Sequence, residues 1–143
     1  MPKLRLFGAL SAATLLASSL ACRAQVVLVA GAHSPAGAMT TDQAASVFLG
    51  KSDKVPGIGT PVLVDEAEGS PAREQFYAKV TGKSPAQVKA AWTRLVFSGK
   101  AQMPREAANA AEVKKLLDAN PNAIGYLEKN AVDSSVKVLL SIE

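Results

Sequence analysis

The chain has 143 residues, with 16 Lys and Arg against 12 Asp and Glu, which gives a formal net charge of +4. Three of the basic residues and none of the acidic ones lie within residues 1–24, so residues 25–143 carry a net charge of only about +1. No basic patch remains that would indicate nucleic acid or an anionic membrane as a partner, and neither partner is expected.

Residues 1–24 have the three-part pattern of a signal peptide. Lys3 and Arg5 provide a cationic start, and an apolar stretch with several small residues follows. For a cut after Ala24, the third and the first residue before the cleaved bond are Cys22 and Ala24, and both are small, as signal peptidase sites require. We therefore expect a secreted, periplasmic protein whose mature domain spans 25–143.

Two other interpretations of this leader remain. The first is a transmembrane anchor, for which the purely apolar part is short. The second is a lipoprotein cut before Cys22, although Ser19 stands where that class usually has a large aliphatic residue. Cys22 is the only cysteine, so cleavage after Ala24 removes any disulfide, thiolate nucleophile or sulfur metal ligand from the mature domain.

The first half of the mature domain predicts two strands and the helix between them. The β-branched run over 26–30 is typical of a buried strand, and a loop of small residues follows over 31–39. Thr40 and Gln43 form a capping box for a helix that ends at Gly50. A Lys-, Pro- and Gly-rich loop then leads to a short strand over 61–65.

The second half predicts three helices followed by two strands. Ser70 with Pro71 starts a helix that ends at Gly82. Another capping box begins at Ser84 and opens a helix with an inner face of apolar residues, and a further helix begins at Asn109. The inner face of the middle helix is predicted to be Val88, Ala91, Trp92, Leu95 and Val96, and the strands are expected over 123–127 and 136–142.

This order of elements predicts an α/β fold: one domain with a mostly parallel or mixed sheet flanked by helices. The first strand, helix and strand are long enough for a right-handed parallel crossover. If the first two strands are parallel, loops 31–39 and 66–69 lie at the same edge of the sheet, and each leads into a helix N-terminus. Two such N-termini would favour an anion at that edge.

Three segments resemble the phosphate-type periplasmic solute-binding proteins of ABC transporters, in particular their short single-domain members. Residues 40–51 are similar to the family's L-T-x-x-Q…I-F-x-G-K helix, and residues 68–76 to its E-G-S-G-T-R-x-x-F anion loop. Residues 120–126 are similar to its N-P-G-A-I-G-Y strand. The three segments follow the family's order and span nearly all of the mature chain.

The resemblance implies a reduced type II binding-protein fold, no cofactor, and a small oxyanion such as phosphate that is delivered to a membrane transporter. It also implies ligand roles for Gly69, Ser70 and Arg73, and for Ser34 in the first loop. The sequence departs from the family in three ways. The family's Gly-Thr is replaced by Pro71-Ala72, acidic residues over 65–68 occupy the place of an arginine, and the chain is less than half the usual length.

Each candidate residue also has an interpretation without a ligand. Ser70 as a plain helix cap contributes about 1 kcal/mol. Arg73 can pair with acids on its own helix, and His33 in a polar loop is usually solvated. The carboxylates over 65–68 could bind a hard cation such as Ca²⁺, or they could form a solvated acidic turn. Their spacing does not match an EF-hand loop, so no metal site is assigned. Trp92 and Tyr126 are expected in the core.

An enzyme is poorly supported, because the mature chain has no cysteine and its single histidine shows no triad pattern. Gly69-Ser70-Pro71 also lacks the second glycine of a nucleophile elbow. Two non-enzymatic functions remain. One is a solute-binding protein for a small oxyanion, and the other is an envelope accessory module that keeps this fold and binds a protein partner.

Overall fold

The computed structural model describes residues 25–142, so the predicted leader lies outside the described residues. In chain order the elements are β1 (Val26–Gly31), α1 (Thr41–Phe48), β2 (Val62–Glu66), α2 (Pro71–Phe76), the π-helical turn η1 (Tyr77–Thr81), α3 (Pro85–Phe97), β3 (Arg105–Ala107), α4 (Ala110–Ala119), β4 (Ala123–Glu128), the 3-10 turn η2 (Lys129–Ala131) and β5 (Val136–Ile142). None of the helices within 25–142 is long and apolar enough to cross a membrane.

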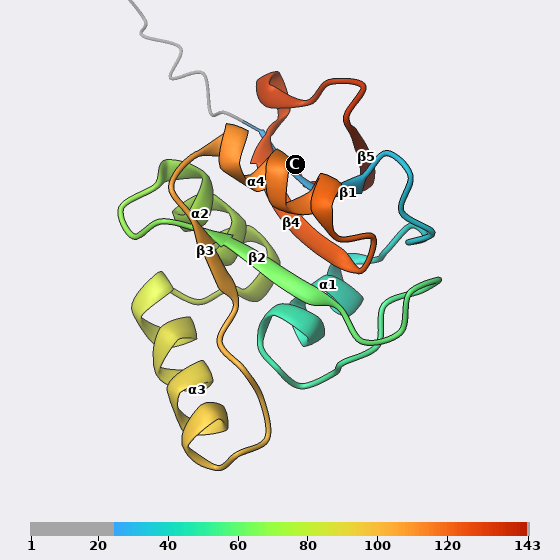
Figure 1. The fold of residues 1–143 in the computed structure, drawn as a ribbon. Coiled ribbons are helices and arrows are strands. Elements are labelled where there is room, and N and C mark those ends of the chain that lie inside the picture. The colour runs from blue at the N-terminus through green and yellow to red at the C-terminus, as the bar shows by residue number, and fades with distance from the viewer. Residues whose placement is uncertain (1–24, 143) are drawn as a thin grey trace, which may run out of the picture.

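The five strands form one open mixed sheet in the order β3-β2-β4-β1-β5 (Figure 1). β2 pairs in parallel with both β3 and β4, whereas β1 pairs antiparallel with both β4 and β5. Four strands therefore run in one direction and β1 runs in the other. The predicted α/β class with a mixed sheet is confirmed, but the parallel crossover from β1 to β2 is wrong, because β4 lies between these two strands and β1 opposes both.

Helices cover both faces of the sheet, and each face has its own apolar cluster. Alternate residues of β1 point to opposite sides, so Val26 and Leu28 join one cluster while Val27 and Val29 join the other. The larger cluster packs under α1, α2, η1 and α3, and the smaller packs under α4, which crosses the opposite face (Figure 1). This three-layer arrangement buries the sheet on both sides, as the continuous apolar run of β1 predicts.

The predicted helix starts are confirmed at the level of individual hydrogen bonds. Thr40 and Ser84 each form a reciprocal capping box with Gln43 and Gln87, respectively. The side chain of Ser70 caps α2 directly before Pro71, and Asn109 caps α4. These caps place the helices where the sequence indicated, because each satisfies a backbone N–H that has no partner in the helix.

The structure differs from the prediction in three details. Val96 does not belong to the inner face of α3, because it is 38% exposed while Val88 and Trp92 are buried. The helix from Ser70 to Gly82 also changes at Tyr77 from an α-helix to a π-helical turn. The short strand β3 was not predicted, since two of its three residues are charged and exposed.

Candidate functional site

Gly69, Ser70 and Arg73 lie together where the carboxyl end of β2 leads into α2. Gly69 has φ +84, a left-handed conformation that favours glycine, and it turns the chain toward α2. The backbone N–H of Ser70 donates to the carbonyl of Ala67, and the hydroxyl oxygen of Ser70 accepts from the N–H of Arg73 at 3.4 Å. The structure therefore brings three of the four predicted ligand residues to one loop.

Ser34 lies at the opposite end of the sheet. Its loop follows β1, and β1 runs against β2, so the two loops cannot share an edge. The hydroxyl of Ser34 donates to the carbonyl of Pro121 at 2.7 Å and accepts from the N–H of Ala36 at 3.2 Å. The prediction of two converging helix N-termini is wrong, and Ser34 holds the 31–39 loop against the start of β4.

Arg73 is buried and its guanidinium is used within the protein. One terminal nitrogen donates to the carbonyl of Glu66 at 3.0 Å, and the other lies 3.9 Å from the carboxylate of Asp65. Glu106 on β3 approaches from the outside at 3.9 Å. These partners lie on strands, not on the arginine's own helix as the sequence suggested. The positive charge is largely neutralised before any ligand arrives.

Asp65 is the centre of this buried network. The hydroxyls of Tyr77 and Tyr126 both donate to its carboxylate, and the hydroxyl of Tyr126 also accepts from the backbone N–H of Glu66 at 3.0 Å. Phe76 stacks on Tyr126 with ring centroids 4.2 Å apart. Burial raises the pKa of Asp65, and the two tyrosine hydroxyls and Arg73 partly offset that rise.

Acidic groups outnumber basic ones around the Gly69–Ser70 turn. Glu66 is buried, and its pKa is raised first by burial and then by the charges of Glu128 and Asp65. Its Oε2 atom has no hydrogen-bond partner among the described residues. Glu68 is exposed and pairs with Lys89. Counted together, the acids Asp65, Glu66, Glu68 and Glu106 face only Arg73 and Lys89, which leaves a formal charge of −2.

The raised pKa of Glu66 gives a testable pH dependence. The folded protein keeps this proton at pH values where the unfolded chain has lost it, so the free energy of unfolding falls as the pH rises above about 4.5. Glu66→Gln should therefore flatten the decline seen in urea unfolding above about pH 4.5. Asp65, whose pKa is also raised, contributes to the decline in both proteins, whereas Glu68 and Asp133, whose pKa values are lowered, contribute stability that both proteins lose as the pH falls. The exposed Glu74→Gln is the control for net charge, and equal slopes in wild type and Glu66→Gln would contradict the assignment.

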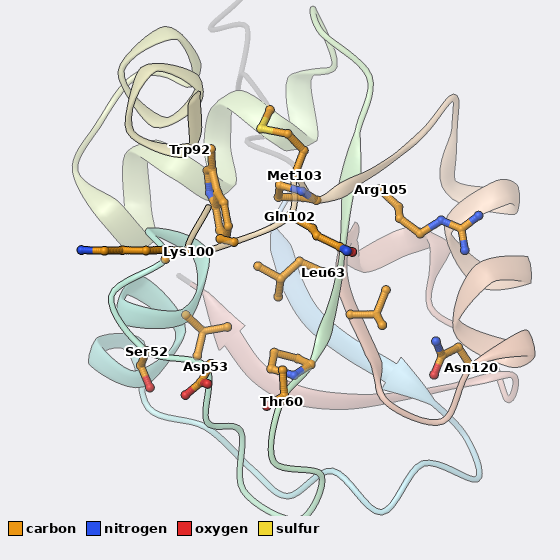
Figure 2. A pocket seen from close by; sticks show the side chains of 16 residues that line it. Ser52, Asp53, Thr60, Leu63, Trp92, Lys100, Gln102, Met103, Arg105 and Asn120 are labelled. Atoms are coloured by element: carbon orange, nitrogen blue, oxygen red, sulfur yellow. The ribbon is translucent and has the colours of Figure 1, made fainter. Parts of the chain in front are cut away.

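One cavity lies beside Arg73, and a larger one lies toward the other end of β2. The first, of about 40 Å³, lies between Asp65, Arg73, Tyr77 and Glu106, and it has room for a few water molecules but not for a solute. The second, of about 540 Å³, lies toward the amino ends of β2 and β3 between α1 and α3 (Figure 2). We call it the α3 groove. It is lined by Val47, Gly50, Ser52, Asp53, Thr60–Leu63, Trp92, Lys100–Arg105 and Asn120.

The α3 groove was not predicted, because its lining comes from five separate segments of the chain. Trp92 was expected to be in the core, and it is buried with its indole N–H donating to the carbonyl of Phe48 at 2.8 Å. Its ring nevertheless forms part of the groove wall, opposite Leu63 and below Met103 in Figure 2. No group of His, Cys, Asp and Glu within 25–142 is arranged to hold a metal ion.

The sequence matches no protein-family model, and no curated protein matches it. Solved structures do match. A phosphate ABC transporter substrate-binding protein from Clostridium perfringens, described with bound phosphate, is 21% identical with a TM-score of 0.62, over 80% of this chain and 44% of that one. An ABC-type phosphate transport receptor from Vibrio cholerae is 17% identical with a TM-score of 0.62, over 80% and 45%. PstS from Borrelia burgdorferi is 12% identical with a TM-score of 0.59, over 80% and 46%.

This chain thus spans less than half the length of the solved proteins that it matches. At these identities the likeness concerns the fold. The resemblance indicated by the three sequence segments is confirmed at that level: the chain has the α/β fold of part of the phosphate-type substrate-binding proteins.

Proposed function

We propose that this protein is a non-enzymatic binding module of the periplasm, which uses the binding-protein fold to recognise a protein partner at the envelope. In this proposal residues 1–24 are a cleaved signal peptide and residues 25–143 are the working domain. The Gly69–Ser70 turn holds a small oxyanion such as phosphate only weakly. The function is therefore binding without the tight solute capture that feeds a transporter.

The observation that carries the proposal is the position of Arg73. A guanidinium strengthens an anion site when its N–H groups point at the ligand. Here it is buried against the carboxylate of Asp65 and the carbonyl of Glu66, in surroundings with a formal charge of −2. A dianion at the Gly69–Ser70 turn would meet Glu66 and Glu68 before it met a free cation.

The oxyanion function is the second candidate, and two observations favour it. The solved neighbours are named as phosphate-binding transport proteins, and the Gly69–Ser70 turn occupies the carboxyl end of β2, where α/β sheets bind ligands. Pro71 lacks the N–H that a glycine would offer, and the adjoining cavity is small. An affinity weaker than tens of micromolar is expected, since a Kd of 1 mM corresponds to only about −4 kcal/mol.

Calorimetric titration of residues 25–143 with phosphate and with sulfate separates the two candidates. We expect either no heat of binding or saturation only at millimolar anion. If weak binding is present, Ser70→Ala should abolish it, whereas Ser98→Ala at the end of α3 should leave it unchanged. Submicromolar phosphate binding that depends on Ser70 would contradict the proposal and establish the solute-binding function.

The proposed location has its own test. The third and the first residue before the expected cut, Cys22 and Ala24, are both small. The intact mass of the exported protein should therefore correspond to a chain that begins at Gln25. The substitution Ala24→Leu should slow removal of the signal peptide, because the cleavage site requires a small residue at this position. A mass that includes a lipid on Cys22 would instead identify a lipoprotein.

A further inference from the structure

The α3 groove is much larger than the cavity beside Arg73; the two share Trp92, Met103 and Pro104, but Gly69, Ser70 and Arg73 do not line the groove. It opens toward the amino ends of β2 and β3, whereas Ser70 and Arg73 follow the carboxyl end of β2. Its volume of about 540 Å³ is within the ordinary range of small binding pockets, about 300–1,000 Å³. It is therefore a separate candidate for recognition.

One part of the groove wall is apolar and well supported. Leu63 on β2 is buried, and the Trp92 ring is fixed by its hydrogen bond to the carbonyl of Phe48. Gly50 lies against Trp92 and Leu95, so even a Cβ at this position would collide with the Leu95 side chain. Leu63 and Trp92 thus form a firmly held apolar part of the wall that offers contact to an aliphatic or aromatic side chain.

Exposed apolar side chains occur at the end of α3 and in the loop after it. Val96, Phe97 and Met103 are three of the four large hydrophobic residues that are exposed within 25–142, and Phe97 is 88% exposed. Met103 lines the groove, and Phe97 lies three residues before the lining residue Lys100. Figure 1 shows α3 and the loop after it at one end of the molecule, away from α4 and β5. A concentration of exposed apolar residues beside a cavity is typical of a protein-binding surface.

Among the residues that line the groove, the two cations Lys100 and Arg105 outnumber the one acid, Asp53. Lys100 and Arg105 line it, and Lys51 and Lys54 flank the lining residues Ser52 and Asp53. All four cations are exposed, and none of them forms an ion pair with another residue in 25–142. Asp53 is the only acidic residue of the lining. The long side chains of Lys100 and Arg105 extend outward from the groove in Figure 2, where they would meet the flanks of a bound chain.

We infer that the α3 groove binds an acidic polypeptide segment of the partner, with one large apolar side chain in the groove and carboxylates against the surrounding lysines and arginine. A small organic anion would leave the outward-facing Phe97 uncovered. A second copy of this chain would bring two predominantly basic rims together, which charge repulsion opposes. This inference deepens the proposed function and rests on it, since it names the surface and the chemistry of the partner.

The test selects peptides from a random dodecapeptide phage library on immobilised residues 25–143. We expect the selected peptides to combine Asp or Glu with an aromatic or large aliphatic residue. Trp92 is the only tryptophan of the chain, so a tryptophan-free synthetic copy of a selected peptide should change its fluorescence on binding. Raising the salt concentration should weaken this binding.

Variants at exposed positions localise the binding. The double variant Phe97→Ser/Lys100→Glu should weaken the Kd of the peptide by at least about tenfold. The control Lys83→Glu makes the same charge change at an exposed position that lines neither cavity, and it should stay within about twofold. Melting temperatures of both variants show that the fold is intact.

Three results would overturn the inference: no enriched peptides, an enriched set without acidic residues, or equal binding by wild type and the double variant. A dimer in sedimentation analysis that Phe97→Ser dissociates would identify a second copy as the occupant. These outcomes are independent of the phosphate titration. Submicromolar phosphate binding would refute the proposed function while leaving the result at the groove intact.

Discussion

Asp65→Ala should reduce the free energy of unfolding by about 3–5 kcal/mol, the usual cost of breaking a buried ion pair from one side. The substitution leaves the buried guanidinium of Arg73 without its carboxylate, and it leaves the hydroxyls of Tyr77 and Tyr126 without their acceptor. Urea unfolding followed by far-UV circular dichroism measures the loss.

Two further variants separate the network from a simple loss of charge. Asp118→Ala removes an exposed acid from α4 and should change the stability by no more than about 0.5 kcal/mol. Asp65→Asn keeps one acceptor oxygen for a tyrosine hydroxyl, so its free energy of unfolding should lie between those of Asp65→Ala and the wild type. A loss below about 1 kcal/mol in Asp65→Ala would show that Arg73 does not depend on Asp65, and that its guanidinium is free to turn toward a ligand.

Trp92→Ala should cost about 3–5 kcal/mol, as expected for a large buried aromatic residue. Trp92 is 6% exposed, packs on Gly50 and joins α3 to the end of α1 through the hydrogen bond from its indole N–H to the carbonyl of Phe48. The same unfolding experiment measures the effect.

Trp92→Phe provides the comparison, because it keeps much of the apolar contact and loses the N–H. It should cost less than the alanine variant, with about 1 kcal/mol of the loss from the missing hydrogen bond. An unchanged melting temperature in Trp92→Ala would show that the tryptophan contributes to the groove alone and not to the core.

The features that were predicted correctly are those that local chemistry determines. A capping residue such as Thr40 or Ser84 acts within one helical turn, so its role can be read from neighbouring residues. The strands predicted over 26–30, 61–65 and 123–127 lie within one residue of the observed β1, β2 and β4, and β5 matches residue for residue. Apolar runs bounded by Gly, Pro or Asn mark these strands without any tertiary information.

The features that were missed depend on contacts between distant segments. No local pattern reveals that β4 inserts between β1 and β2, and this insertion separates Ser34 from Ser70. Arg73 is close in sequence to Glu74, yet it pairs with Asp65 and Glu106, because its side chain in the first turn of α2 reaches the carboxyl ends of β2 and β3. A ligand role inferred from a short motif could not anticipate this competition within the fold.

Two of the residues at which the 65–76 segment differs from the family's anion loop, Asp65 and Glu66, contact Arg73 in the buried network. Phosphate-type proteins usually have an arginine before this loop, and here the stretch contains Asp65, Glu66 and Glu68. The structure uses Asp65 to hold the tyrosines and Arg73 inside the fold, and Glu66 lies buried beside the Ser70 cap. Arg73 and Asp65 thus form contacts within the domain, and the α3 groove, lined by Lys100 and Arg105, is a separate candidate surface.

Site-specific photo-crosslinking in the periplasm tests most directly whether the protein acts through a partner at the α3 groove. A benzoylphenylalanine is placed at Phe97 beside the groove in one variant and at Glu68 beside the Gly69–Ser70 turn in another, and both positions are exposed. We expect a discrete crosslinked protein from position 97 that Lys100→Glu weakens, and none from position 68. A crosslinked protein from position 68 alone, or from neither position, would contradict the account.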